Sequence, residues 1–329
     1  MPANLTPEYR NAEERLRTAA TDAEKLDALR EMLSTIPKHK GTEKLQADIK
    51  RRISRLNREL QKTRKSGRGP QLDHVPKEGA GQVVLVGAPN AGKSSFLEAV
   101  TNARATVADF PFSTFKPQPA MMPFEDIQIQ LVDLPPVSAE YMESWVPAII
   151  RLADLALLLV DLSTPDPAEE ALIVMEVLET HKVRLIGQPD ESRDQAPLHL
   201  KKTVIMGTKC DVEGSTEGLQ SLRDLYGEEF PIFCLSVHTG EGLEAAKRAI
   251  FDALGIVRVY TKVPGKKPDL DQPYVLPKGS TVLDVAVAIH REFADKMRYA
   301  RIWGSEKYDG QQVYRGHCVQ DGDIIEVHI

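Results

Sequence analysis

Short apolar runs alternate with longer amphipathic segments through the middle of the chain. Residues 83–86, 155–160 and 203–206 are almost wholly apolar, as is typical of strands buried on both faces of a parallel sheet. Residues 127–133 alternate apolar and polar side chains, which predicts a strand exposed on one side. Because helical segments separate these runs, the pattern predicts an α/β fold with a mostly parallel sheet over residues 81–256.

The pattern changes after residue 255. An apolar face on residues 281–294 predicts one helix. Strands are predicted around it, at residues 257–261, 273–277, 299–303 and 324–327. Several strands around one helix predict a separate small α+β domain over residues 257–329.

The first 67 residues are mostly polar and helical in pattern. Thr21 and Glu24 form a capping-box pattern, and a third helix is predicted from near Thr42. Apolar side chains form one stripe along that helix, at Leu45, Ile49, Ile53, Leu56 and Leu60. Basic side chains lie largely off the stripe, at Lys44, Arg51, Arg55, Arg58 and Lys62. Two interpretations stay open for these basic residues, a solvated helix face or a face that contacts RNA phosphates.

Composition narrows the class of protein. At 329 residues with 42% hydrophobic content, the chain can form two or three domains with ordinary cores, joined to the helical region by a linker over residues 68–80. A net charge of −6 argues against bulk polyanion binding by the whole chain, and the three cysteines follow no metal-ligand or disulfide pattern. No apolar stretch approaches the roughly 18 residues of a membrane span, and no signal-peptide pattern opens the chain. We therefore expect a cytoplasmic protein without membrane contact.

Residues 87–95 read Gly-Ala-Pro-Asn-Ala-Gly-Lys-Ser-Ser, between an apolar run and a helical segment. In this context the spacing G-x-x-x-x-G-K-S predicts a phosphate-binding loop. Its glycines let backbone N–H groups approach phosphate oxygens, Lys93 can reach the β- and γ-phosphates, and Ser94 can bind Mg²⁺. The predicted phosphate-binding residues are Gly87, Pro89, Asn90, Ala91, Gly92, Lys93, Ser94 and Ser95.

Two further side chains fit a magnesium-dependent site. Asp133 ends the predicted strand 127–133, where a carboxylate can act on Mg²⁺ through a water molecule. Thr114 lies on a proline-marked loop upstream, and such a threonine can complete the Mg²⁺ shell only when a γ-phosphate orders the loop. We therefore expect Ser94, Thr114 and Asp133 at Mg²⁺, and Lys93 and Thr114 as the catalytic groups.

A second motif predicts which nucleotide base the protein binds. The apolar residues 203–206 lead into Thr208-Lys209-Cys210-Asp211. A carboxylate at Asp211 can accept from guanine N1–H and the 2-amino group together, a donor pair that adenine lacks. The next predicted strand, 232–235, ends where its loop could close over the base edge. The predicted guanine-binding residues are Thr208, Lys209, Asp211, Ser236 and Val237.

In this order, the elements resemble those of the GTPases. The Pro-Asn pair in the phosphate loop, the Phe-Ser-Thr element at 112–114 and the Asp-x-Pro at 133–135 are similar to the Obg and developmentally regulated GTP-binding protein group. The resemblance covers residues 81–256 and implies a P-loop GTPase that binds GTP or GDP with Mg²⁺ and acts on ribosomes or RNA. Residues 181–200 are predicted to be a polar insertion, and this chain is too short for the extra small domain that related proteins carry within the fold.

The chain departs from that group at two positions. Pro136 stands where the group has a glycine whose N–H donates to the γ-phosphate, and proline has no N–H. Val137 follows, where many GTPases carry a glutamine that orients water. One expectation is a slow GTPase stimulated by a protein activator, the ribosome or K⁺; the alternative is a guanine-nucleotide-binding scaffold with little hydrolysis. In related GTPases the residue at Asn90 can bind K⁺, although asparagine is equally a good turn residue.

The segment 257–329 resembles a TGS domain, a ubiquitin-like β-grasp module. The similarity lies in Leu-Pro-Lys-Gly-Ser-Thr-Val at 276–282, Ala-x-x-Ile-His at 286–290 and Gln-Asp-Gly-Asp at 320–323. Because TGS domains occur in proteins that work around RNA or the ribosome, the resemblance implies a module that contacts a ligand or RNA. A packing domain without its own ligand is the alternative, and the oligomeric state stays open.

Overall fold

The computed structural model describes residues 74–101, 117–188, 198–306 and 308–329, together with residues 12, 15–17, 22–36, 46 and 49–53 of the N-terminal part. The chain divides into two compact units, Met1–Gln71 and Leu72–Ile329. Thr114, the rest of the Phe-Ser-Thr element and most of the predicted basic helix lie outside the described residues.

The N-terminal unit has a small apolar core of its own. Helix α2 (Asp22–Thr35) contributes Leu29 and Met32, which lie one helical turn apart on one face. They are buried together with Ile36, Ile49 and Ile53. Residues 49–53 are helical, so the described part of the predicted apolar stripe faces this core.

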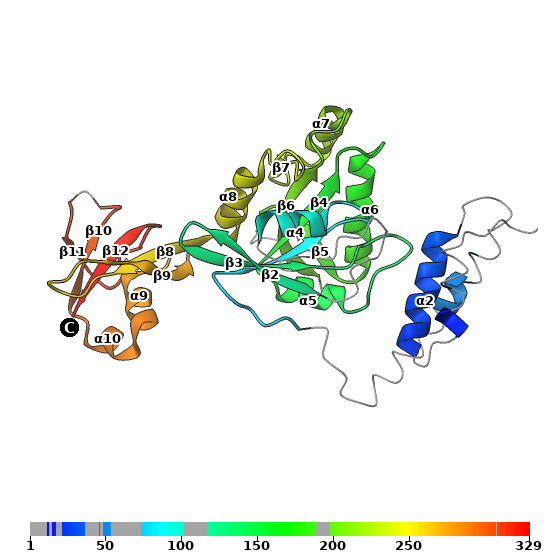
Figure 1. Cartoon of the computed structure of the whole chain (residues 1–329). Helices are drawn as coiled ribbons and strands as arrows, with labels where there is room; N and C mark the ends of the chain where they lie inside the picture. The colour runs from blue at the N-terminus through cyan, green and yellow to red at the C-terminus, as the bar shows by residue number, and fades with distance from the viewer. Residues whose placement is uncertain are drawn as a thin grey trace, which may run out of the picture. The chain divides into compact units, whose positions relative to one another are not determined.

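The larger unit contains a seven-stranded sheet in the order β2-β3-β1-β4-β6-β5, with β7 paired to β6. Its strands are β1 (Gln82–Val86), β2 (Gln118–Phe124), β3 (Ile127–Asp133), β4 (Leu155–Asp161), β5 (Val183–Ile186), β6 (His199–Thr208) and β7 (Ile232–Cys234). The β2–β3 pair is antiparallel, and the other strand pairs described in this sheet are parallel. The predicted α/β fold with a mostly parallel sheet is confirmed (Figure 1).

Helices cover both faces of this sheet. They are α4 (Lys93–Val100), α5 (Val146–Leu152), α6 (Pro167–Thr180), α7 (Ser215–Tyr226) and α8 (Leu243–Leu254). Helices α5, α6 and α7 share one core with Val84 and Val86, whereas α4 and α8 share the other with Val83 and Leu85. Successive strand residues point to opposite faces, so a strand between two helical layers must be apolar throughout. No helix within the described residues is long and apolar enough to cross a membrane.

The prediction that residues 127–133 are exposed on one side is wrong. Within β3 only Gln128 is exposed, and Gln130 is buried. Gln130 lies opposite Gln82 of β1, whose Nε2 donates to Gln130 Oε1 at 2.8 Å. Gln130 Nε2 in turn donates to the carbonyl oxygen of Pro76 at 3.1 Å. The paired amides allow this polar position to be buried, and a periodic pattern cannot reveal such a partner.

The C-terminal part forms a second sheet of five strands in the order β11-β10-β12-β8-β9. Its elements are β8 (Ile256–Thr261), β9 (Asp269–Pro277), α9 (Val282–Ile289), α10 (Arg291–Lys296), β10 (Tyr299–Trp303), β11 (Gln311–Val313) and β12 (Asp323–His328). Both helices contribute to one core with β8, β10 and β12. The predicted small α+β domain is confirmed (Figure 1).

Two segments differ from their predicted structure. The single helix predicted over 281–294 is two helices, because His290 between them adopts an extended conformation with φ −170°. The segment 181–200, predicted to be a polar insertion, contains β5 and the start of β6, and its residues 189–197 lie outside the described chain. A strand as short as β5 carries too few residues for a reliable periodic signal.

Candidate nucleotide-binding site

The loop between β1 and α4 reverses direction through residues with left-handed backbone conformations. Asn90 and Gly92 have φ values of 64° and 83°, which asparagine and glycine tolerate better than other residues. A Cβ atom at Gly87 would lie 2.4 Å from the carbonyl oxygen of Leu159. The first glycine of the motif is therefore required by the close approach of β4.

Lys93 opens α4, and only 6% of this residue is exposed. Its Nζ donates to the carbonyl oxygens of Gly87 at 3.0 Å and Ala88 at 2.8 Å. Burial lowers the pKa of Lys93 to about 8, although the charges of Asp133 and Glu170 oppose the shift. A phosphate bound at this helix N-terminus would favour the charged form, so the ammonium group is placed for an anionic ligand.

Ser94 and Asp133 are in direct contact. Asp133 is fully buried at the end of β3, and Ser94 Oγ donates to its Oδ2 at 2.5 Å. A hydroxyl and a carboxylate oxygen suit Mg²⁺, which proteins often bind through one or two carboxylates together with substrate phosphates and water. Across the described residues, no group of three or more His, Cys, Asp or Glu side chains could hold a metal ion. The pair therefore fits a metal that arrives with a nucleotide.

The Thr-Lys-Cys-Asp motif is tied to the phosphate loop. Thr208 Oγ1 donates to the carbonyl oxygens of Ala91 at 3.0 Å and Val160 at 3.2 Å. Lys209 has a left-handed backbone with φ 59°, and its ammonium group pairs with the carboxylate of Asp161 at the end of β4. The Lys209 side chain is thus held at the ends of two neighbouring strands.

Asp211 is exposed, so its carboxylate can be reached by a base. A hydrogen bond from Ser236 holds the pKa of Asp211 below its ordinary value, so the carboxylate stays ionised and can accept hydrogen bonds from a base. Ser236 is fully buried, and Val237 is half-buried beside it. The two loops predicted to surround guanine are therefore adjacent in the fold.

Val137 occupies a position that excludes it from contact with an attacking water. Its side chain is fully buried within the core beneath α5 and α6. Its N–H donates to the carbonyl oxygen of Gly87 at 3.1 Å. Since Pro136 has no N–H, neither residue supplies a backbone donor for a γ-phosphate in this conformation.

Strand register gathers most of the predicted site residues at one edge of the sheet. Leu85 of β1 lies opposite Asp133, and Asp161 lies opposite Thr208. In the phosphate loop Ala91 is buried, Pro89, Gly92, Ser94 and Ser95 are half-buried, and Asn90 is exposed. The individual binding roles of these residues stay predictions, and Thr114 is not among the described residues.

Known proteins resemble this chain in both domains of the larger unit, the α/β domain and the C-terminal domain. A family model described as 50S ribosome-binding GTPase matches residues 82–187, and a TGS domain model matches residues 257–329. A GTP-binding protein of Methanocaldococcus jannaschii is 28% identical over 365 residues, covering 93% of this chain and 92% of that protein. The developmentally regulated GTP-binding protein 2 homologue of Dictyostelium discoideum is 25% identical over 359 residues, covering 92% and 98%. The chain carries a GTPase domain and a TGS domain, and it is similar over most of its length to developmentally regulated GTP-binding proteins.

A solved crystal structure also resembles this GTPase. The GTP-binding protein from Pyrococcus horikoshii OT3 is 16% identical, with a TM-score of 0.49 over 75% of this chain and 99% of that one. The two family models confirm the GTPase domain and the TGS domain that the sequence predicts.

Two acidic residues of the GTPase site were not predicted from motifs. Asp161 holds Lys209, and its position after a wholly apolar strand is a signal that could have identified it. Glu170 of α6 has its Oε1 buried without a hydrogen-bond partner among the described residues. Burial and the nearby Asp161 raise the pKa of Glu170 to about 7. No local signal could reveal Glu170, because only the fold brings α6 to the strand ends.

Replacing Glu170 with Gln should change the pH dependence of stability. In the folded protein the pKa of Glu170 is about 7, against an ordinary value of 4.5. The folded state therefore holds this proton more tightly, and the associated stability is lost as pH rises from about 4.5 to 7. The neutral Glu170→Gln variant should be more stable than the wild type at pH 8 by about 1–2 kcal/mol, after allowance for partial hydration of the carboxylate.

Urea unfolding of the nucleotide-free protein at pH 5, 6.5 and 8 would measure this difference. Glu169→Gln is a matched control, because Glu169 lies beside Glu170 in the first turn of α6 but is exposed. If the free energy of unfolding depends on pH in the same way in the wild type and in Glu170→Gln, the raised pKa of Glu170 would be contradicted.

Proposed function

We propose that this protein binds GTP and GDP with Mg²⁺, hydrolyses GTP slowly and acts as a nucleotide-dependent switch on the ribosome or another RNA in the cytoplasm. Its GTPase family supports nucleotide binding and hydrolysis in general. The observation that carries the proposal is the placement of Lys93, the Ser94–Asp133 contact and the Asp211–Ser236 pair at neighbouring strand ends. Ligands of open α/β sheets bind at this carboxyl edge.

The phosphates would be bound by the backbone of residues 87–95 and by Lys93. Ser94 would bind Mg²⁺ directly, and Asp133 would act on it through water. Thr114 would complete the Mg²⁺ shell when the γ-phosphate is present. These roles follow from the chemistry of each group and from the described contact between Ser94 and Asp133.

The guanine base would lie between the two loops that follow β6 and β7. Asp211 would accept from its N1–H and 2-amino groups, and the hydrogen bond from Ser236 keeps that carboxylate ionised. Thr208 and Lys209 would flank the base, with Val237 at its edge. An adenine in the same place would offer no donor pair to Asp211, so we propose selectivity against ATP.

Slow intrinsic hydrolysis is supported by the surroundings of Asp133. Val137 is buried and its N–H is bonded to Gly87, so it can neither orient water nor bind the γ-phosphate here. Partner or K⁺ stimulation would then supply what the chain lacks. Asn90 is exposed at the tip of the phosphate loop, where its amide oxygen could bind K⁺, but its left-handed conformation also explains why a turn residue stands there.

A ribosomal or RNA partner is proposed from three features. The matching family is described as ribosome-binding, and the chain carries a TGS domain. Its N-terminal region, residues 1–67, adds a run of basic side chains before the linker 68–80. We place the GTPase domain at 81–256 and the TGS domain at 257–329.

A second candidate function is a scaffold that holds guanine nucleotide with little or no hydrolysis. The observation that favours it is the same buried Val137, together with Pro136. In that case the nucleotide would be a structural ligand, and a protein activator would not be required.

Replacing Asp211 with Asn should weaken GTP binding by about 100-fold or more. The amide can accept only one of the two hydrogen bonds from guanine, without charge, and its NH2 group would face the other donor. An asparagine amide can instead donate to the 2-oxo group of xanthine, so the variant should gain affinity for XTP. Calorimetric titration with both nucleotides would measure the exchange. Unchanged GTP affinity in the Asp211→Asn variant would contradict the proposal that Asp211 binds guanine.

GTP turnover in K⁺ and in Na⁺ buffers, with and without ribosomes, would separate the slow GTPase from the scaffold. We expect low turnover that ribosomes increase. The Asn90→Gly variant keeps the left-handed turn but removes the amide oxygen, so it should lose any K⁺ stimulation if that oxygen binds the cation. Tight GTP binding without turnover in every condition would favour the scaffold.

A further inference from the structure

The antiparallel hairpin β2–β3 links the nucleotide site to a distant contact. At one end Gln118 pairs with Asp133, and at the other Phe124 pairs with Ile127. Each strand has seven residues, which gives the ribbon a length of about 20 Å. Strand β1 pairs with residues 130–133, and Gly79 and Ala80 just before it contact Ile129 and Gln128. The end of the ribbon at Phe124 and Ile127 therefore lies beyond the pairing with β1.

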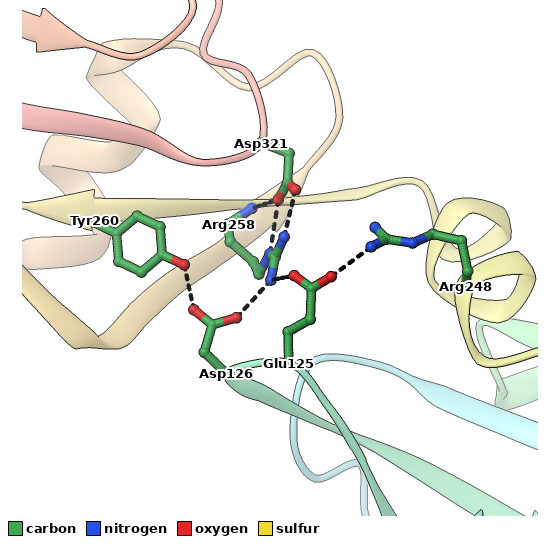
Figure 2. Close-up of polar contacts among 6 residues, drawn as sticks. All are labelled: Glu125, Asp126, Arg248, Arg258, Tyr260 and Asp321. Atoms are coloured by element: carbon green, nitrogen blue, oxygen red, sulfur yellow. Dashed lines mark hydrogen bonds and ion pairs between the residues drawn. The ribbon is translucent and has the colours of Figure 1, made fainter. Parts of the chain in front are cut away.

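Two acidic residues form the tip of this hairpin, and both contact the TGS domain (Figure 2). Arg258 of β8 donates from Nη1 to Asp126 Oδ1 at 2.6 Å and also to Glu125. Tyr260 of β8 donates its hydroxyl to the other oxygen of Asp126. Arg248 of α8 pairs with Glu125 from the GTPase side. We call these five residues the tip latch.

The latch is anchored firmly on the TGS side. Arg258 makes a bidentate pair with Asp321, from Nε at 3.0 Å and Nη2 at 2.7 Å, and its own backbone N–H donates to Asp321 Oδ1 at 2.8 Å. Its side chain is only 8% exposed. The Arg258 guanidinium donates from all three of its nitrogens to three carboxylates, which fixes its orientation.

Aromatic side chains pack beside the same junction. The rings of Phe124, the last residue of β2, and Phe251 of α8 stack with centroids 4.9 Å apart. The guanidinium groups of Arg248 and Arg258 lie 4.8 Å from the Phe124 ring and 5.1 Å from the Phe251 ring. The contact between hairpin tip and TGS domain is therefore packed as well as charged.

The backbone conformation of the hairpin tip indicates that Glu125 is present for its side chain. Glu125 has φ 49°, a conformation that two-residue hairpin turns commonly give to Gly, Asn or Asp. A glutamate stands there, and its carboxylate is used by Arg248 and Arg258. A hairpin that needed only to turn would be served better by glycine.

We propose that the tip latch is a positioning device for Asp133, through which the TGS domain controls Mg²⁺-dependent retention of the nucleotide. This inference rests on the proposed function, because it takes Asp133 as a group that acts on Mg²⁺. The latch fixes one end of a stiff ribbon whose other end carries Asp133, and small displacements of a catalytic or metal-binding group have large effects. By reciprocity, a partner that shifts the TGS domain and changes the affinity for nucleotide has its own affinity changed by the same factor when nucleotide binds.

The test uses the full chain with the paired substitution Glu125→Gln and Asp126→Asn. Side chains of these residues are 44% and 22% exposed, so neutral isosteres remove the charges without opening a core. In Mg²⁺ buffer the variant should release a fluorescent N-methylanthraniloyl-GDP about fivefold faster or more, and should need more Mg²⁺ for half-maximal retention. In excess EDTA both proteins should release it at the same rate, since Asp133 acts only through the metal.

Two further variants make the test specific. Tyr260→Phe removes one hydroxyl from the latch and should give a smaller change in the same direction. Glu292→Gln breaks an ion pair within α10 of the TGS domain and should change nothing. Equal acceleration in Mg²⁺ and in EDTA, or no acceleration at all, would overturn the latch alone. A wild-type protein whose release of this nucleotide does not respond to EDTA would overturn the latch together with the proposed function.

Discussion

The parallel register of β1, β3, β4 and β6 is the constraint on which the nucleotide site depends. Each of these strands is buried between helical layers, and its side chains alternate between two cores. A shift of one residue would exchange the faces of a strand and is strongly disfavoured. The register therefore fixes Asp133 and Thr208, the last residues of β3 and β6, at one edge of the sheet. The loop that follows β1 brings Lys93 to the same edge.

Buried charged side chains gather at that edge of the sheet. Burying a charge is unfavourable unless another group or a ligand compensates for it. Lys93 is buried against loop carbonyls, and burial lowers its pKa to about 8. Glu170 is brought close enough to Asp161 and Lys93 for their charges to act on it. A site with shifted pKa values in buried groups of both signs is typical of a functional centre, and a Mg²⁺-bound triphosphate matches its chemistry.

Sequence reasoning predicted the parts of this molecule that depend on local spacing. The phosphate loop, the apolar strands and the Thr-Lys-Cys-Asp motif are each contiguous in the sequence, and their relative order indicated a GTPase. Sequence reasoning failed where a residue's burial or position depends on another residue that is distant in the sequence. Gln130 is buried because Gln82 lies opposite it, and Glu170 enters the site only through the packing of α6. The tip latch joins residues more than a hundred positions apart, such as Asp126 and Arg258, which no motif records.

The central claim is that the loops after β6 and β7 select guanine while the phosphate loop holds Mg²⁺ and phosphates. Competition of unlabelled GTP and ATP against N-methylanthraniloyl-GDP on the wild-type protein tests it most directly. The account predicts that GTP displaces the probe at concentrations about 100-fold or more below those needed with ATP, because adenine lacks the donor pair for Asp211. Equal competition by ATP would contradict it.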